Sequence, residues 1–170
     1  MAHPSRRHVD QASRQGNGQI GKAALKELRL DSPESTFALG ERIGRQAAAG
    51  TTIALRGGLG AGQTLLTKGI ARGLDIEDEV TSPTYTIISE YEGRLRLHHI
   101  DAWRLLGAED FDSIGGDDIV ADPRGITVIE WSERIEGALP PDRITIELVL
   151  LDGDARMARF EGAFDDRWLA

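Results

Sequence analysis

The sequence contains no cysteine, so it can form neither a disulfide framework nor a thiolate metal site. It also lacks an apolar run of the roughly 20 residues that span a bilayer. Its N-terminus is polar and has no apolar core of the kind found in signal peptides. We therefore expect no membrane segment and a cytoplasmic protein.

Basic residues are scarce relative to acidic ones. The chain has 20 lysines and arginines against 28 aspartates and glutamates, which gives a net charge of −8. A protein that binds nucleic acid by itself usually presents a basic face, so this balance argues against that class. If the protein serves a nucleic acid, we expect it to do so through partner proteins.

The length predicts one folded domain. A chain of 170 residues can bury most of its surface without disulfides or structural metals. Residues 1–25 are polar, rich in glycine and without hydrophobic period, which predicts a disordered tail. We expect the folded domain over residues 26–162 and a C-terminal tail over residues 163–170.

The segment GGLGAGQT, residues 57–64, nearly matches the phosphate-binding pattern G-x-x-x-x-G-K-[ST]. In such a loop the glycines let backbone N–H groups close around phosphate oxygens, and the hydroxyl binds Mg²⁺. Only Gln63 departs from the pattern, which has lysine there to add positive charge at the phosphates. The candidate nucleotide-binding residues are Gly57, Gly58, Leu59, Gly60, Ala61, Gly62, Gln63, Thr64 and Leu65.

The flanks of this loop fit the pattern. Residues 51–56 form an apolar, β-rich run typical of a buried strand, and residues 64–74 carry a helical apolar stripe. A helix N-terminus directs free N–H groups and a favourable dipole at an anion. An ordinary glycine-rich turn is the alternative, and the combined glycines, Thr64 and both flanks argue against it.

The other elements indicate an α/β protein. We expect a three-layer P-loop NTPase-like fold with a mixed, mainly parallel central sheet. Ser32 and Pro33 predict the start of a helix that ends near Gly50. The remaining predictions are strands over residues 26–30 and 125–131, hairpins over 84–91 with 94–100 and 143–151 with 155–161, a short helix over 108–114, a loop over 115–118 and a helical turn over 132–137.

Two carboxylates follow apolar strands directly. Asp101 comes after RLRLHHI and Glu130 after ITVI. The carboxyl ends of strands are where an open α/β sheet binds its ligand, and an acidic residue there can hold Mg²⁺ or its water. The alternative is a carboxylate that caps the following turn. The sequence therefore predicts a magnesium site of Thr64, Asp101 and Glu130.

A polar segment and two histidines complete the candidates. In TSPT, residues 81–84, Thr84 is a candidate for a switch hydroxyl that senses the terminal phosphate. His98 and His99 are adjacent on a predicted strand, so their side chains face opposite sides of the sheet. They cannot chelate one ion together without a bulge, which disfavours a zinc site.

Five segments occur in an order and spacing that closely resemble the TsaE family, the small bacterial ATPase subunit of the machinery that makes threonylcarbamoyladenosine in tRNA. They are GGLGAGQT, TSPTYT, HHIDAWRL, VIEWSERI and LPPDRITIEL. The resemblance extends from about Leu28 to Glu161. It implies ATP and Mg²⁺ as ligands, weak ATPase activity, and the TsaB and TsaD proteins as partners, with TsaD performing the transfer to adenosine and tRNA met only through the complex.

The resemblance also implies roles for single residues. Thr64 would bind magnesium and Thr84 would be the switch threonine. Asp101 and Glu130 would act beside the metal and its water. Trp131 would line the nucleotide pocket, and Arg104 would support the segment after Asp101.

Three positions depart from the family pattern: Gln63 replaces lysine, Gly58 a usual aspartate, and Trp103 a usual tyrosine. Glutamine is neutral, and exchanging a charge-assisted for a neutral hydrogen bond is expected to weaken ATP binding about tenfold. Loss of one preorganised donor to the transition state typically lowers the rate roughly 10²–10³-fold.

Two functions therefore stay open, namely a slowed ATPase and a nucleotide-binding scaffold subunit without hydrolysis. A small-molecule kinase is disfavoured because the sequence has no lid-like arginine cluster. Among the cations considered as a replacement for the lysine, Lys68 lies too far along the helix, while Arg56 and Arg104 are near enough in sequence to be considered.

Overall fold

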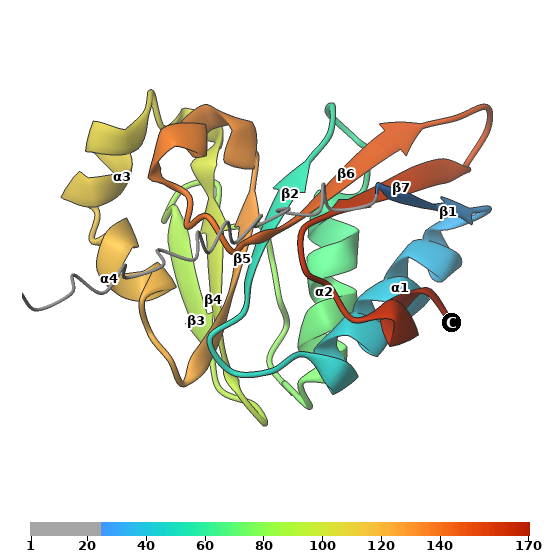
Figure 1. Cartoon of the computed structure of the whole chain (residues 1–170), viewed down its shortest axis with the longest axis horizontal. Helices are drawn as coiled ribbons and strands as arrows, with labels where there is room; N and C mark the ends of the chain where they lie inside the picture. Colours follow the sequence, from blue (N-terminus) through green and yellow to red (C-terminus); the bar gives the residue numbers. More distant parts are fainter. Residues whose placement is uncertain (1–24) are drawn as a thin grey trace, which may run out of the picture.

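The computed structural model describes residues 25–170, so the tail predicted over residues 1–25 lies, except for Leu25, outside the described residues. The core of the fold is a seven-stranded sheet in the order β1-β7-β6-β2-β5-β4-β3 (Figure 1). The strands are β1 (Lys26–Leu30), β2 (Thr52–Arg56), β3 (Ile88–Tyr91), β4 (Arg96–Asp101), β5 (Gly125–Glu130), β6 (Ile144–Leu150) and β7 (Arg156–Glu161).

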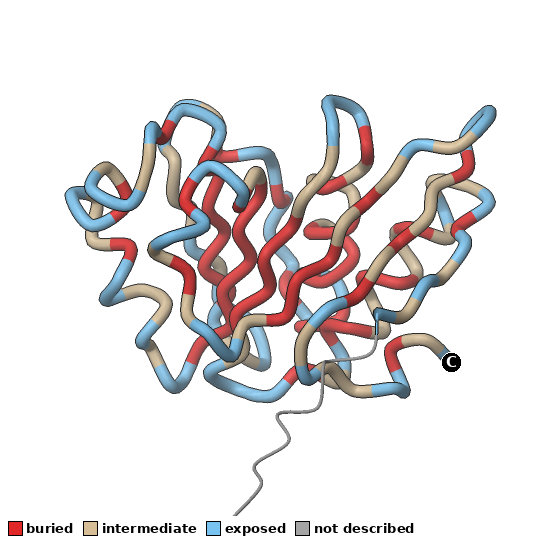
Figure 2. The backbone as a smooth tube through the Cα atoms, turned by 45° about the horizontal axis from the view of Figure 1, so that its top comes forward, coloured by how far each residue is buried: buried red, intermediate tan, exposed pale blue. Residues whose placement is uncertain are grey.

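The middle of the sheet is parallel and its edges are antiparallel. Strands β6, β2, β5 and β4 run in one direction, whereas β1, β7 and β3 pair antiparallel to their neighbours. Every residue of β5 is buried, as expected for a parallel strand covered on both faces. Figure 2 shows this buried centre as a block of red strands.

Helices cover both faces of the sheet (Figure 1). Two long helices lie on one face and short helices lie on the other, which confirms the predicted three-layer α/β fold. The helices are α1 (Pro33–Gln46), α2 (Gln63–Gly73), α3 (Ala108–Ser113) and α4 (Gly116–Val120), with 3₁₀ turns η1 (Ala102–Arg104), η2 (Ser132–Ala138) and η3 (Asp166–Leu169). No helix within residues 25–170 is long and apolar enough to cross a membrane.

The first helix begins where the sequence predicted. Ser32 Oγ accepts the Ser35 N–H at 3.3 Å, and Ser35 Oγ accepts the Ser32 N–H at 3.0 Å, a reciprocal cap ahead of Pro33. A Cβ atom on Gly44 would collide with the carbonyl oxygen of Ile70. The backbones of α1 and α2 therefore touch, and this contact fixes the position of α2.

Two sequence predictions need correction in the middle of the chain. The strand expected over residues 84–91 begins only at Ile88, because Ile87 has φ +67° and donates its N–H to the Pro83 carbonyl at 2.6 Å in a turn. The loop expected over residues 115–118 is wrong beyond its first residue. Gly115, with φ +79°, reverses the chain, and α4 starts at Gly116.

The C-terminal segment is also more ordered than the tail expected over residues 163–170. Trp168 in η3 is 2% exposed and belongs to the same apolar core as α1 and α2. Its carbonyl accepts from Arg42 Nε at 3.1 Å. Burial of this large side chain extends the packed region to Leu169.

Candidate functional site

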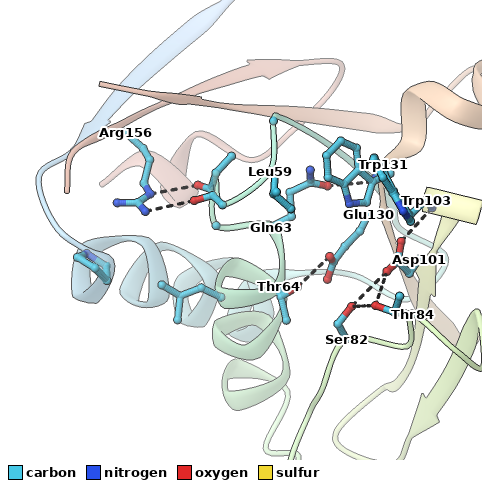
Figure 3. Close-up of a pocket in the computed structure, with 16 residues that line it drawn as sticks. Leu59, Gln63, Thr64, Ser82, Thr84, Asp101, Trp103, Glu130, Trp131 and Arg156 are labelled. Atoms are coloured by element: carbon cyan, nitrogen blue, oxygen red, sulfur yellow. Dashed lines mark hydrogen bonds between the residues drawn. The ribbon is translucent and has the colours of Figure 1, made fainter. Parts of the chain in front are cut away.

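A cavity of about 490 Å³ opens at the carboxyl ends of the parallel strands, in front of the N-terminus of α2 (Figure 3). This is where an open α/β sheet binds its ligand. The lining residues are Pro33, Gly58, Leu59, Gly60, Ala61, Gly62, Gln63, Thr64, Leu65, Ser82, Thr84, Asp101, Trp103, Glu130, Trp131 and Arg156. All the candidate site residues predicted from the sequence except Gly57 line it, so the fold brings them together.

The loop of residues 57–64 depends on its glycines. Gly60 and Gly62 have φ values of +76° and +109°, which residues with a side chain rarely adopt. A Cβ on Gly57 would lie 2.5 Å from the Leu148 carbonyl oxygen. In contrast, a Cβ on Gly58 would meet nothing within 4 Å, so that position has room for the aspartate that the family resemblance implies.

The side-chain amide of Gln63 bonds to backbone on both sides. Its Nε2 donates to the Gly57 carbonyl at 2.9 Å, and its Oε1 accepts the Trp131 N–H at 2.9 Å. Gln63 is 5% exposed. The residue at the lysine position therefore links the start of the loop to the end of β5.

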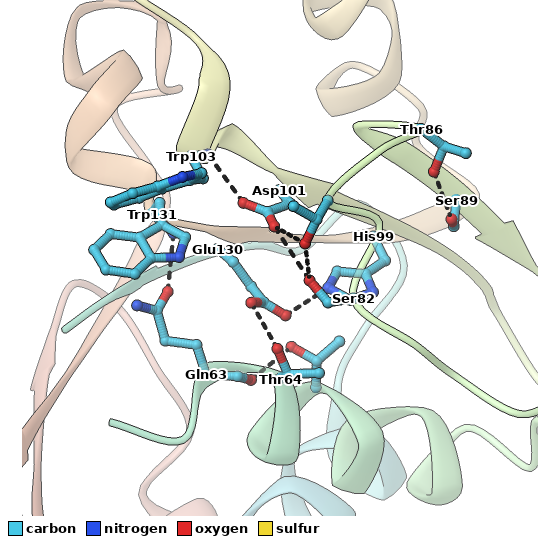
Figure 4. Close-up of polar contacts among 12 residues, drawn as sticks. Gln63, Thr64, Ser82, Thr86, Ser89, His99, Asp101, Trp103, Glu130 and Trp131 are labelled. Atoms are coloured by element: carbon cyan, nitrogen blue, oxygen red, sulfur yellow. Dashed lines mark hydrogen bonds and ion pairs between the residues drawn. The ribbon is translucent and has the colours of Figure 1, made fainter. Parts of the chain in front are cut away.

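Glu130 lies between the loop helix and β4 (Figure 4). Its Oε2 accepts from Thr64 Oγ1 at 2.9 Å. Its Oε1 lies 2.7 Å from Nε2 of His99, which must be the donor because a carboxylate only accepts. Sequence reasoning considered His99 only as a zinc ligand and missed its contact with Glu130. The available signal was its position two residues before Asp101, which places both side chains on the same face of β4.

Asp101 binds two separate groups. Its Oδ2 accepts from the hydroxyls of Ser82 and Thr84, both at 3.2 Å. Its Oδ1 accepts the Trp103 N–H at 2.9 Å and so caps η1, the structural role weighed as the alternative. The Asp101 carboxylate thus connects η1 to the segment of residues 81–84. Ser82 was not predicted as a site residue.

Three side chains of the cavity could supply oxygen ligands to a metal ion. Thr64, Asp101 and Glu130 offer a hydroxyl and two carboxylates, the hard ligands that Mg²⁺ prefers. Across the described residues, no group of three or more His, Cys, Asp or Glu side chains could hold a metal ion. A cation here would therefore draw its other ligands from water and from phosphate oxygens, as Mg²⁺ usually does.

Two tryptophans form one wall of the cavity. The ring centroids of Trp103 and Trp131 are 4.5 Å apart with an interplanar angle of 58°. The guanidinium of Arg134 lies 4.7 Å from the Trp103 centroid. Trp131 has φ +55°, a left-handed conformation that is costly for a large residue. Such strain often occurs at ligand sites.

None of the three cations considered from the sequence lines the cavity. Arg56 forms an ion pair with Glu136. Arg104 lies over the Tyr85 ring, 5.0 Å from its centroid. Lys68 lies on another surface of α2. The cationic side chain in the lining is Arg156, which sequence reasoning missed.

Comparisons with known proteins relate the chain to one family. The family described as "Threonylcarbamoyl adenosine biosynthesis protein TsaE" matches residues 30–158. Two proteins named "tRNA threonylcarbamoyladenosine biosynthesis protein TsaE" are similar to the chain. The one from Treponema pallidum is 44% identical over 124 residues, which cover 72% of this chain and 91% of that protein. The one from Bacillus subtilis is 39% identical over 139 residues, which cover 80% and 86%.

A solved structure is similar throughout the fold. The crystal structure of Bacillus subtilis YdiB superposes with a TM-score of 0.71 at 34% sequence identity. The match covers 87% of this chain and 91% of that one.

Proposed function

This chain belongs to the TsaE family of tRNA threonylcarbamoyladenosine biosynthesis proteins, and we propose that it serves that modification by binding ATP with Mg²⁺ in the cavity of residues 57–65. The observation that carries the proposal is the hydrogen bond from Thr64 to Glu130 at the end of a glycine-built loop. It joins the hydroxyl of a phosphate-binding pattern to a carboxylate that follows a buried strand.

Each part of the cavity has a role in this proposal. The loop amides and the N-terminus of α2 would bind the phosphates. Thr64, Asp101 and Glu130 would hold Mg²⁺, which supplies positive charge to neutralise the phosphate oxygens. His99 keeps Glu130 oriented through its Nε2–H. Trp131 would lie against the nucleotide as part of the cavity wall.

Thr84 is the proposed switch residue. Its hydroxyl already contacts Asp101, and its neighbour Ser82 contacts the same oxygen. The segment of residues 81–84 is therefore held through hydrogen bonds that a nearby phosphate or metal would compete for. We propose that nucleotide binding rearranges this segment.

The proposed hydrolysis is weak. Gln63 carries no charge, so the site lacks the lysine that would stabilise the transferring phosphoryl group. A second candidate function is a nucleotide-binding scaffold subunit without hydrolysis. It is favoured by one observation, that both amide atoms of Gln63 are bonded to backbone groups.

We further propose that the chain acts with the TsaB and TsaD proteins and meets tRNA only through them. The net charge of −8 suits a subunit that binds proteins. Large apolar side chains are exposed on or near the rim of the cavity: Leu59 and Tyr85 are each 86% exposed. Such groups are typical of surfaces that bind partners.

Calorimetric titration with ATP, with and without Mg²⁺, tests the nucleotide proposal. The chain should bind ATP more tightly with Mg²⁺. Thr64→Val should abolish that gain, and the matched variant Thr64→Ser should keep it, because only the hydroxyl is needed. Failure of the chain to bind ATP under either condition would overturn the proposal.

Hydrolysis and assembly are measured separately. Phosphate release is followed with the chain alone and with purified TsaB and TsaD, and co-elution of the three proteins is examined in the presence of ATP. Release above background supports the ATPase. ATP-dependent co-elution without phosphate release supports the scaffold function. Absence of co-elution would overturn the proposal that TsaB and TsaD are partners.

A further inference from the structure

Arg156 is held rigidly at the edge of the cavity. It is the first residue of β7, and its backbone lies opposite Leu150 of β6 and Leu30 of β1 in the antiparallel part of the sheet. Its side chain approaches the phosphate loop from the side opposite to Trp131 (Figure 3). A strand paired on both sides gives this residue a fixed base.

The guanidinium of Arg156 binds the loop itself. Its Nε donates to the Ala61 carbonyl at 3.1 Å and its Nη2 to the Gly60 carbonyl at 3.4 Å, while its Nη1 donates to the Asp154 carbonyl. All three acceptors are backbone carbonyls and none is a carboxylate. The positive charge of Arg156 is thus not neutralised by an ion pair within residues 25–170.

These contacts affect which groups the loop offers to an anion. The C=O and N–H of a trans peptide point in opposite directions, so the Ala61 carbonyl bound by Arg156 turns the Gly62 N–H away from the arginine. The N–H after the Gly60 carbonyl, that of Ala61, instead donates to the Gly58 carbonyl at 3.1 Å and braces the loop. On the other side of the loop, Gln63 binds the Gly57 carbonyl in the same way. Two side chains therefore hold three of the loop carbonyls, at Gly57, Gly60 and Ala61.

The charges along the cavity are also unevenly placed. Asp101 and Glu130 lie at the end where a metal would bind, and Arg156 is the cation among the lining residues. Gln63 adds no charge at the lysine position. Arg156 would therefore supply the positive side-chain charge to a polyphosphate bound in the loop.

We propose that Arg156 is the basic residue of this phosphate site, holding the Gly60 and Ala61 carbonyls outward and favouring ligands with a long phosphate chain. The proposal rests on the proposed nucleotide function. In this proposal a residue of β7 supplies part of the positive charge that lysine provides in the G-x-x-x-x-G-K-[ST] pattern. Arg156 acts on the nucleotide through the loop and through its charge, so it is a positioning residue.

The test compares ATP with AMP, both with Mg²⁺, by calorimetry. Arg156→Gln should lower the affinity for ATP about tenfold, the difference expected between charged and neutral hydrogen-bond donors. The affinity for AMP should change less than about twofold, because its single phosphate carries less negative charge for Arg156 to attract than the triphosphate of ATP. Arg156→Lys keeps the charge and should retain most of the preference for ATP.

Arg159→Gln is the matched control. Arg159 is on the same strand but binds Glu27 and Glu147, so its loss should leave both affinities unchanged. Arg156→Met provides a second neutral variant of similar length, and circular dichroism melting checks that each protein is folded.

The outcomes separate the two proposals. A parent chain that binds no ATP overturns the nucleotide function and, with it, the role of Arg156. A parent that binds ATP while a folded neutral variant binds it equally well overturns the role of Arg156 alone. Equal losses for ATP and AMP would also overturn it, because they would indicate a structural role without preference for phosphate.

Discussion

Trp131 donates its backbone N–H to Oε1 of Gln63 at 2.9 Å, and this bond joins the phosphate loop to the aromatic wall of the cavity. The other amide atom of Gln63 donates to Gly57. An amide side chain can donate and accept at once, whereas lysine has donors and no acceptor. Glutamine at position 63 therefore stabilises the local structure, and it also leaves the loop without the positive charge of a lysine.

Gln63→Lys should raise hydrolysis and lower stability together. The ammonium restores charge at the transition state, for which we expect a rate increase of about 10²-fold. The same change leaves the Trp131 N–H without its acceptor, which should cost about 1 kcal/mol of unfolding free energy. Phosphate release and urea unfolding measure the two effects.

Gln63→Met is the control for this variant. Methionine has a similar length and removes both hydrogen bonds without adding charge, so it should be destabilised and show no increase in rate. Equal rates for the parent and Gln63→Lys would mean that glutamine does not limit catalysis.

The parts of the site that follow from local pattern were predictable. The strand, glycine loop and helix around residues 57–64 are adjacent in sequence, so turn chemistry and periodicity indicated them. Asp101 and Glu130 were predictable because each ends an apolar strand, and parallel strands place those ends together. Their pairing in the register of β4 and β5 confirms this placement.

The parts that depend on sheet order were not predictable. Arg156 follows Ala61 by 95 residues, and the two meet only because β7 and β6 lie beside β2 in the sheet. Nothing near Arg156 in the sequence distinguishes it from other strand arginines. The contact between His99 and Glu130 likewise needs the alignment of two strands. Helix α4 was missed because Gly115 and Gly116 together predict a loop, although Gly115 forms only the turn that precedes the helix.

His99→Leu should weaken the response to Mg²⁺. His99 is fully buried, and its Nε2–H fixes one oxygen of Glu130 while Thr64 binds the other. Loss of a group that orients a metal ligand typically lowers metal affinity 10–100-fold, and we expect about tenfold here. Titration of ATP binding against Mg²⁺ concentration measures it.

The conservative variant separates orientation from packing. His99→Gln keeps a side-chain N–H donor, so it should recover part of the Mg²⁺ response that His99→Leu loses. Identical Mg²⁺ dependence in the parent and His99→Leu would contradict a positioning role, whatever happens to thermal stability.

Tryptophan fluorescence should report on the ligand. Trp103 and Trp131 pack together in the cavity wall, and Trp131 is bonded to Gln63. We expect ATP with Mg²⁺ to change the emission of the parent. The change should persist in Trp168→Phe, since Trp168 is buried in the core that contains α1 and α2. It should be lost when Trp103 and Trp131 are both replaced by phenylalanine, and persistence in that double variant would place the ligand elsewhere.

Gly44→Ala should destabilise the fold through the contact between α1 and α2. The new methyl group would collide with the Ile70 carbonyl, and backbone cannot move aside as a flexible side chain can. We expect a loss of at least about 2 kcal/mol, which lowers Tm by roughly 4–8 °C in a chain of this size. Gly137→Ala is the control, because a Cβ there meets nothing within 4 Å. Since α2 begins at the phosphate loop, a shift of the two helices should also weaken ATP binding by Gly44→Ala, and unchanged Tm and affinity would show that the helices can separate freely.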